Sequence, residues 1–410
     1  MNRPNPLPEI AREGALLAAI IGARLDFAEG RETDAAAAEA KMIALGDRAR
    51  IDRLCALFGA TPPERAALMV VAAPLFDPSL SARYQALTGR AWVTEPLVER
   101  LYPDQAPVLV EAGLLARWGV FSILQELIGE PPAIAAAPEL RSWLSGRTGI
   151  PASVAEAMSM APAPEPLANW PVAEVAARLA AAFKRNERVR LVVSGLEGAG
   201  RASFVAAVAA ALGQSALIVD PARLSTKWSR ADTLTAQRAA IALGAALIWR
   251  SPIEAEMLAP GGLWPAAFQA VAAAPGDAAP APRDLACFDI KLPPLDAKER
   301  ARLIDAATPA AAGWSAETRT ALATRPALTP GAIARLARTA PKTDAEALAA
   351  ANRGAADGMG ELAEQVPGDL GWDDLILPEA LKSDLCDLAY EARVKGSAFE
   401  RPDVERLFRR

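Results

Sequence analysis

The chain of 410 residues contains no histidine. Histidine is the usual general base of hydrolases and a common zinc ligand, so its absence excludes catalytic triads that depend on an imidazole. Only three cysteines occur, Cys55, Cys287 and Cys386, and they are far apart in the sequence. This spacing fits no zinc site and is typical of a protein in a reducing compartment. We therefore expect neither a metal centre nor a catalytic residue of these types.

Long hydrophobic runs and an excess of positive charge are also lacking. The net charge is −5, which gives no general attraction to nucleic acid or to an anionic membrane. The longest early apolar run, at 14–23, is too short to span a bilayer and lies between Glu13 and Arg24. Glu9 and Glu13 also do not fit the basic start of a signal peptide. The expectation is a cytoplasmic protein with no membrane or nucleic-acid partner.

The first 150 residues favour a mainly helical domain. Thr61, followed by prolines and by Glu64, is a capping-box start for a buried helix. The segment 113–124 indicates a helix end followed by a short strand, and 131–146 indicates a turn and one more helix. Several short helices with one or two strands predict a winged-helix-like domain over 1–150.

A winged helix raises the alternative of DNA binding, because such domains place a helix in the major groove. The charges of this region do not favour it: Arg83 and Arg90 are accompanied by Asp77, Glu95 and Glu99. A basic stripe with interleaved aromatic residues is not seen. A role in protein docking or packing is therefore the preferred interpretation of this domain.

Residues 151–171 are rich in proline and alanine and are predicted to be a linker. Beyond them the sequence favours an α/β fold. Strands are expected at 189–194 and 216–219 with a glycine turn and a helix between them, which makes a βαβ unit with parallel strands. Further strands are expected at 245–250 and 285–292, followed by helices that begin near Asp296 and Thr329. Strands alternating with helices, then a small helical piece, predict a sheet with a helical lid.

The glycine turn, VVSGLEGAGRASF at 192–204, stands where a P-loop would be. Gly195 and Gly200 have the spacing of G-x-x-x-x-G-K-[ST], and Gly198 lies between them. In such a loop backbone N–H groups surround the phosphates, the lysine reaches the β and γ phosphates, and the hydroxyl holds magnesium.

Two positions of the pattern are replaced. Arg201 takes the lysine position, and arginine is cationic but bulkier and planar. Ala202 takes the hydroxyl position, and Ser203 is rotated by about 100° along the helix, away from the metal. We expect the loop to hold a phosphate and to hold magnesium poorly.

A second catalytic element is replaced as well. Hydrolysis needs carboxylates at the end of a nearby strand to position magnesium and water. The strand AALIWR at 245–250 ends in Trp249 and Arg250 instead, and the Trp249 ring is expected to lie near the nucleotide space.

Four interpretations of the turn are weighed at this point. It is a turn without a ligand, a degenerate site that still binds nucleotide, an active ATPase site, which the replaced residues disfavour, or a dinucleotide site. The last rests on Gly198, Gly200 and Ser203 as a partial G-x-G-x-x-G pattern, with Asp220 ending the next strand.

In this order of parts the chain resembles an AAA+ ATPase over roughly 170–345. VVSGLEGAGRAS corresponds to the P-loop, AALIWR to the acidic strand, and KLPPLDAKERARLID to the segment that leads into the lid. LTPGAIARLA corresponds to the lid helix, which puts Arg335 at or beside the second sensor, an arginine that reads the γ-phosphate. The resemblance implies an AAA+-like P-loop NTPase domain over 172–300 and a helical lid over 301–355.

The flanking segments resemble one subgroup, the AAA+ proteins of contractile injection systems, which are phage-tail-like machines. LFGATPPERAALMVVAAPLFDPSLSARY and PELRSWLSG resemble its N-terminal domain, and GWDDLILPEALKSDLCDLAYEARVKG resembles the approach to a second AAA module. On that pattern residues 356–410 are a linker and the start of a second module. The chain would then be a shortened protein or a fragment of a longer one with two modules.

The implied function is weak ATP binding, or support of ring assembly and docking, with AAA+ subunits or phage-tail-like components as partners. Hydrolysis would belong to another module. The alternative is a structural interaction protein that binds no nucleotide.

Overall fold

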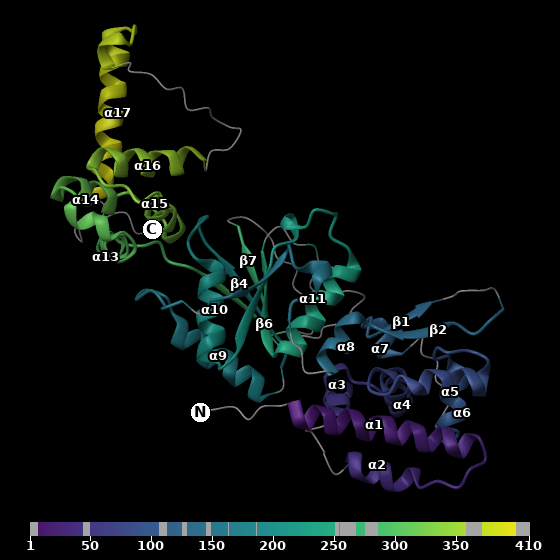
Figure 1. Cartoon of the computed structure of the whole chain (residues 1–410). Coiled ribbons are helices and arrows are strands. Elements are labelled where there is room, and N and C mark those ends of the chain that lie inside the picture. Colours follow the sequence, from purple (N-terminus) through teal and green to yellow (C-terminus); the bar gives the residue numbers. More distant parts are fainter. Residues whose placement is uncertain are drawn as a thin grey trace.

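The computed structural model describes residues 7–43, 50–105, 113–124, 129–144, 149–162, 164–185, 187–250, 254, 268–274, 286–357 and 371–398. A helical N-terminal block, a central sheet flanked by helices and a bundle of short helices follow one another along the molecule (Figure 1). The last described helix projects away from the bundle.

The N-terminal block is built on helices, as the sequence predicts. The predicted capping box is confirmed: the Thr61 hydroxyl accepts a bond from the Glu64 backbone N–H, and the Glu64 carboxylate accepts one from the Thr61 backbone N–H. The helices are α1 (Leu7–Ala28), α2 (Ala35–Ile43), α3 (Arg50–Phe58), α4 (Pro62–Ala72), α5 (Ser79–Thr88), α6 (Glu95–Leu101), α7 (Leu114–Arg117) and α8 (Pro138–Leu144).

One hairpin completes this block. Strands β1 (Phe121–Leu124) and β2 (Ala133–Ala136) pair antiparallel, and Val93 forms an isolated antiparallel bridge to Ile134. The predicted strand in 113–124 is therefore confirmed, whereas β2 lies where only a turn was expected. The helices and the hairpin agree with the predicted composition of the domain, and its assignment as winged-helix-like stays a prediction.

The central sheet has six strands in the order β3-β5-β6-β7-β4-β8. All neighbouring pairs except β3–β5 are parallel, which confirms the predicted α/β class with a mainly parallel sheet. The strands are β3 (Met158–Ala161), β4 (Val189–Ser194), β5 (Ser215–Val219), β6 (Ala245–Arg250), β7 (Phe268–Ala273) and β8 (Ala286–Lys291).

Two of these strands were not predicted. β7 lies between β6 and β4 in the middle of the sheet, although its sequence, FQAVAA, is half alanine. β3 lies within 151–171, so the expectation that this whole segment is a linker is wrong: Met158–Ala161 pair with Val219–Ala216 of β5. Edge pairing supplies hydrogen-bond partners that a local reading of a Pro- and Ala-rich segment does not reveal.

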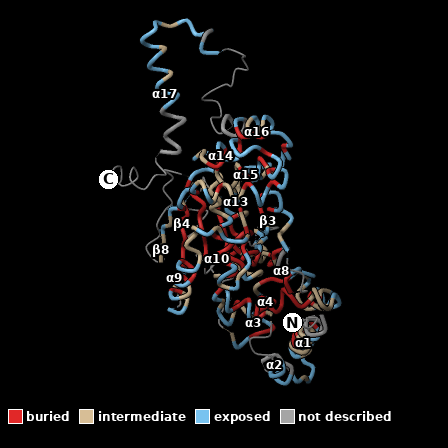
Figure 2. Tube along the Cα trace, turned by 90° about the vertical axis from the view of Figure 1, so that its left-hand side faces the viewer, coloured by how far each residue is buried: buried red, intermediate tan, exposed pale blue. Residues whose placement is uncertain are grey.

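Helices cover both faces of the sheet. α9 (Val172–Lys184) and α10 (Arg201–Ala211) bury apolar side chains against one face, and α11 (Arg230–Leu243) does so against the other. Buried residues are concentrated in these layers and in the helices of the N-terminal block, whereas α17 is largely exposed (Figure 2).

The predicted lid region forms a bundle with its own core around Ile304, Trp314 and Leu336. Its helices are α13 (Ala297–Ala307), α14 (Ala316–Ala323), α15 (Pro330–Thr339) and α16 (Asp344–Asp357). The capping box at Asp296 and Glu299 is present. Of 356–410, residues 356–357 end α16 and residues 371–398 hold α17 (Glu379–Ala398), while 358–370 and 399–410 lie outside the described residues. In the described part of the chain, no helix combines the length and the hydropathy required to cross a bilayer.

Candidate functional site

The glycine turn lies at the carboxyl end of β4, the strand next to the edge strand β8. The neighbours of β4 in space are β7 and β8, whereas β5, the next strand in sequence, lies three positions away. Ligands of open α/β sheets bind at the carboxyl ends of strands, where the chain leaves for opposite sides. The topology therefore puts the turn at the edge where a ligand site is expected.

Two of the three glycines adopt backbone conformations that other residues rarely take. Gly198 has φ +75° and Gly200 has φ +86°, and Gly200 directly precedes α10. Gly195 is buried at the start of the turn. The positive φ values at Gly198 and Gly200 explain why glycine is needed at these two places.

The residues that follow the glycines diverge. The Arg201 guanidinium donates to the backbone carbonyl of Ala273, at the end of β7, so it is directed across the strand ends. Ala202 is half-buried and packs against the α9–α10 side of the core. Ser203 is exposed on α10. Of the three, Arg201 alone brings a charge to this edge of the sheet.

The strand that replaces the acidic one ends differently from the sequence expectation. Trp249 has no exposed surface and donates from Nε1 to Gln269 Oε1 at 2.9 Å, within the core on the α11 side of the sheet. The expectation that its ring lies in the nucleotide space is therefore wrong. Arg250, at the end of β6, is exposed and forms an ion pair with Asp220 at 3.2 Å. Asp220, the acid considered for a dinucleotide ribose, is therefore paired with an arginine of the neighbouring strand.

The lid contacts the glycine turn directly. The Gly331 backbone N–H, at the start of α15, donates to the Gly198 carbonyl at 2.7 Å. A Cβ at Gly331 would lie 2.9 Å from Gly198 Cα, so the backbones touch. Arg335, the expected second-sensor residue, is exposed one turn further along α15 and has no hydrogen bond or ion pair to the described residues. The structure thus joins α15 to the turn through glycines and not through Arg335.

A cavity of about 510 Å³ opens beside the turn. Its walls come from the end of β4, the segment after β8, the start of α15 and the residues before α9, and nearly all of them are apolar. The lining residues are Leu167, Trp170, Ser194, Gly195, Leu196, Ala199, Lys291, Leu292, Pro293, Pro294, Leu295, Pro326, Leu328, Thr329 and Pro330.

Sequence reasoning missed much of this cavity. Trp170 was assigned to the linker, yet its ring lies edge-on to Phe204, with centroids 5.7 Å apart, and a Cβ at Gly200 would come within 2.8 Å of it. Lys291 was expected to lie at the end of a strand and to begin the segment that leads into the lid, with no role in a ligand site. The spacing of these residues along the chain gives no hint that they meet, because a parallel sheet brings them together through crossovers.

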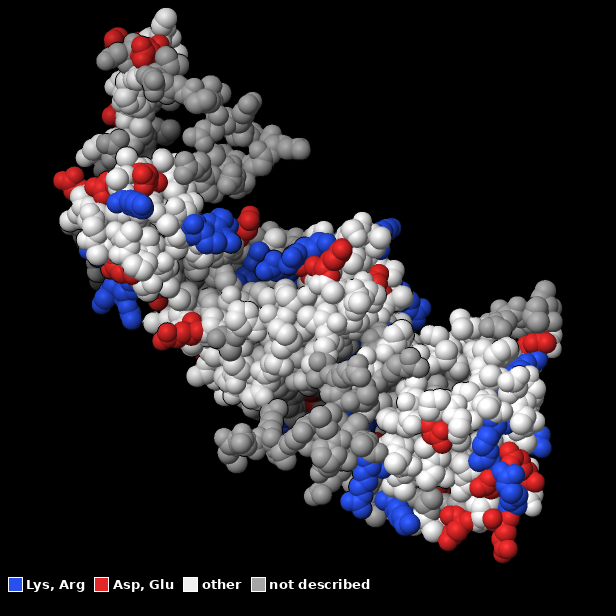
Figure 3. Space-filling view, viewed as in Figure 1, with Lys and Arg blue, Asp and Glu red and all other residues white. Residues whose placement is uncertain are grey.

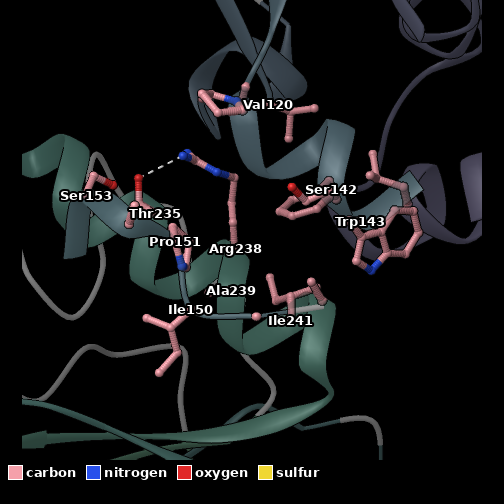
Figure 4. A pocket seen from close by; sticks show the side chains of 18 of the residues that line it. Val120, Ser142, Trp143, Ile150, Pro151, Ser153, Thr235, Arg238, Ala239 and Ile241 are labelled. Atoms are coloured by element: carbon pink, nitrogen blue, oxygen red, sulfur yellow. Dashed lines mark hydrogen bonds between the residues drawn. The ribbon is translucent and has the colours of Figure 1, made fainter. Parts of the chain in front are cut away.

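A larger cavity, of about 700 Å³, lies away from the glycine turn, between the N-terminal block and α11. Arg238 of α11 crosses it and donates to Thr235 Oγ1 at 2.9 Å (Figure 4). The same guanidinium donates to the Trp118 carbonyl at 2.7 Å. Val120, Trp143 and Ile150 give it a mainly apolar wall. It marks the junction of two parts of the chain and holds none of the predicted site residues.

Charged groups do not gather into a surface of one sign on the face shown in Figure 3, where lysine and arginine alternate with acidic residues. Among the residues that the structure places, no group of three or more cysteine, aspartate and glutamate side chains is arranged to hold a metal ion.

Comparison with known proteins adds little to this picture. Neither a family model nor a curated protein matches the chain. Among solved structures, the one titled "Crystal structure of FIGL-1 AAA domain" is similar to this chain. The match covers 59% of this chain and 93% of the FIGL-1 chain, with 13% sequence identity and a TM-score of 0.32. A likeness this low leaves the candidate site to be judged from its own geometry.

Proposed function

We propose that the chain is an AAA+-like protein that binds an adenine nucleotide at the glycine turn without hydrolysing it. The observation that carries the proposal is the 510 Å³ cavity next to the turn. Its volume is within the range of about 300–1,000 Å³ that small-molecule sites have, and such sites combine apolar walls with a few polar groups. The base would lie against Trp170 and the phosphates would face the turn.

The same geometry argues against catalysis. No carboxylate stands at Trp249 or Arg250, and Trp249 is enclosed in the core. Ala202 offers no hydroxyl to a metal. We infer a role in supporting ring assembly or in docking on a contractile injection machine, with AAA+ subunits or phage-tail-like components as partners, on the sequence resemblance.

Calorimetric titration of the full chain with ATP, with and without magnesium, tests the proposal. Saturable binding that does not depend on magnesium, with no release of phosphate, is expected. Trp170→Ala should weaken the binding of ATP by about tenfold or more, because stacking of a base on an aromatic ring is worth about 1–3 kcal/mol. Trp372→Ala, an exposed tryptophan near α17, is the matched control and should leave binding unchanged.

One observation favours a second function, a structural interaction protein with no nucleotide. The Gly331 N–H already occupies the Gly198 carbonyl, and Trp170 lies over Gly200, so the turn is partly covered. An absence of binding heat up to millimolar ATP would support this function and contradict the first.

A further inference from the structure

A site for phosphates needs a cation as well as backbone N–H groups, and the glycine turn has replaced its lysine. Arg201 is directed to the Ala273 carbonyl, and neither Arg201 nor Arg335 lines the cavity. The sequence candidates for the cation therefore do not stand where a bound ligand would lie.

Lys291, the last residue of β8, does line it. β8 is paired with β4 in parallel so that Lys291 is the partner of Ser194, the residue just before Gly195. The Leu292 N–H donates to the Ser194 carbonyl at 2.9 Å, which fixes the two strand ends beside each other. Lys291 therefore lies beside Ser194, the residue that precedes the first glycine of the turn.

The alternation of β8 explains why this side chain is accessible. Phe288 and Ile290 are half-buried against the α9–α10 side of the core, whereas Cys287, Asp289 and Lys291 are exposed on the other face. A lysine at the end of a strand keeps a flexible stem of four carbons and a compact ammonium with three donors. Its reach is therefore not fixed by the strand.

Lys291 is the sole charged residue among the described residues that line the cavity, and no ion pair or hydrogen bond joins it to another described residue. Of the acids nearest in sequence, Asp289 lies on the same exposed face of β8 two residues earlier, without an ion pair to Lys291, and Asp296 accepts from the Glu299 backbone N–H at 2.7 Å as the cap of α13. Glu197 of the turn is exposed and is not a lining residue. An apolar cavity with one lysine among its lining residues suits a ligand with an apolar ring and an anionic end.

We propose that Lys291 binds the phosphate groups of the nucleotide and replaces, from the neighbouring strand, the cation that the glycine turn lacks. The proposal rests on the proposed function, since it names a residue of that same site. Arg201 then acts as a positioning residue that ties the start of α10 to the end of β7.

Titration of Lys291→Ala with ATP and with adenosine tests this. A charge-assisted hydrogen bond is worth about 1.5–3 kcal/mol, so ATP should bind about tenfold or more weakly, while adenosine, which has no phosphate, keeps its affinity. Lys298→Ala removes an exposed lysine of α13 and is the control. Thermal unfolding of each variant shows that the fold is kept.

Unchanged ATP affinity in Lys291→Ala would overturn the proposal, and so would an equal loss for ATP and adenosine, which would mean that the lysine only packs. A selective loss of ATP affinity in Arg201→Ala, with no loss in Lys291→Ala, would mean that Arg201 is the cation that binds the phosphates. Failure of the unaltered chain to bind either ligand would instead overturn the proposed function itself, so the two failures are distinguishable.

Discussion

At the residue scale, Trp249 stands at the end of β6, where an active ATPase would need an acid to hold magnesium. Its ring is enclosed by the α11 side of the core and lies edge-on to Trp228, with ring centroids 6.1 Å apart. The hydrogen bond to Gln269 satisfies its only polar atom. The Trp249 side chain is therefore part of the hydrophobic core. Replacing it with an acidic residue would change the core and not the surface.

Trp249→Asp should accordingly unfold the sheet and not restore hydrolysis. Loss of a buried tryptophan costs about 3–5 kcal/mol, and a buried carboxylate adds to that. Arg250→Gln, at an exposed position, should cost about 1 kcal/mol or less, because it loses only the partly exposed ion pair with Asp220. Urea denaturation of both variants measures the difference. Equal stability of the two would contradict the placement of Trp249.

A second feature at the residue scale is the difference in burial between Cys55 and Cys287, which should make their thiols differ in reactivity. Burial raises the pKa of the Cys55 thiol to about 12, whereas Cys287 is exposed. Because the thiolate is the reactive form and burial disfavours it at Cys55, very little of Cys55 is reactive at pH 8. Alkylation of the native chain at that pH should label Cys287 well before Cys55, with mass spectrometry of peptides as the readout. Rapid labelling of Cys55 would show that α3 opens.

The same pKa shift has a definite sign for stability. The Cys55 pKa is higher in the folded chain than the value of about 8.5 in an unfolded one, so the folded chain retains a proton that the unfolded one loses. Its contribution is complete below about pH 8.5 and is lost as the pH rises further towards 12. Cys55→Ala should therefore reduce the loss of stability between pH 8.5 and 10, measured by urea denaturation.

At the scale of single elements, the start of α4 does more than cap a helix. Glu64 is 4% exposed, and while one carboxylate oxygen accepts from the Thr61 N–H, the other accepts from the Leu115 N–H of α7 at 2.8 Å. A Cβ at Gly113 would come within 2.4 Å of the same carboxylate, which explains the glycine there. One side chain thus fixes α7, and with it the start of the hairpin, to α4.

Glu64→Ala should destabilise the N-terminal block by about 1.5–3 kcal/mol, because it leaves buried N–H groups without the charged acceptor. Glu64→Gln keeps an acceptor oxygen and should cost less. Ser315→Ala removes an ordinary N-cap, that of α14, and should cost about 0.5–2 kcal/mol. Hydrogen exchange at Leu115 separates the cases, since only the Glu64 variants expose that amide.

The elements were predictable from sequence wherever local chemistry determines them. Thr61 with Glu64, and Asp296 with Glu299, mark helix starts within a few residues, and β4, β5, β6 and β8 are apolar or alternating runs between turns. β7 and β3 were missed because alanine and methionine have no strong preference for strands, and these segments become strands by pairing with neighbours far away in sequence.

The candidate site was predictable only in part for the same reason. Spacing located the three glycines and Arg201, all on one continuous segment. Trp170, Lys291 and Gly331 reach the turn from other segments through the sheet crossovers and the lid. No local pattern records such meetings, so these residues emerge only from the folded chain.

At the scale of the whole molecule, the N-terminal block is joined to the sheet through α11. Arg238 donates to the Trp118 carbonyl, and Gly119, with φ +64°, leaves room for the guanidinium, which a Cβ would approach to 2.6 Å. Leu234 of the same helix belongs to the core of the N-terminal block. The junction therefore combines polar contact with apolar packing.

Arg238→Ala should weaken this junction by about 1.5–3 kcal/mol, the usual worth of a hydrogen bond from a charged donor. Faster hydrogen exchange at α11 and at 118–121 is expected, while the exchange of α13–α16 stays the same. Arg223→Ala, an exposed arginine after β5, is the control. Faster exchange in the lid as well would mean that Arg238 stabilises the fold as a whole and not the junction.

The contact between Gly198 and Gly331 has a mechanical consequence for the whole chain. Because it joins one backbone to another with no side chain between, neither partner can yield by changing a rotamer. α15 is in turn held in the bundle by Ile333 and Leu336. A ligand that displaces the turn by a fraction of an ångström would push α15, and the bundle would swing as a rigid lever whose far end travels much further than the loop that moved it.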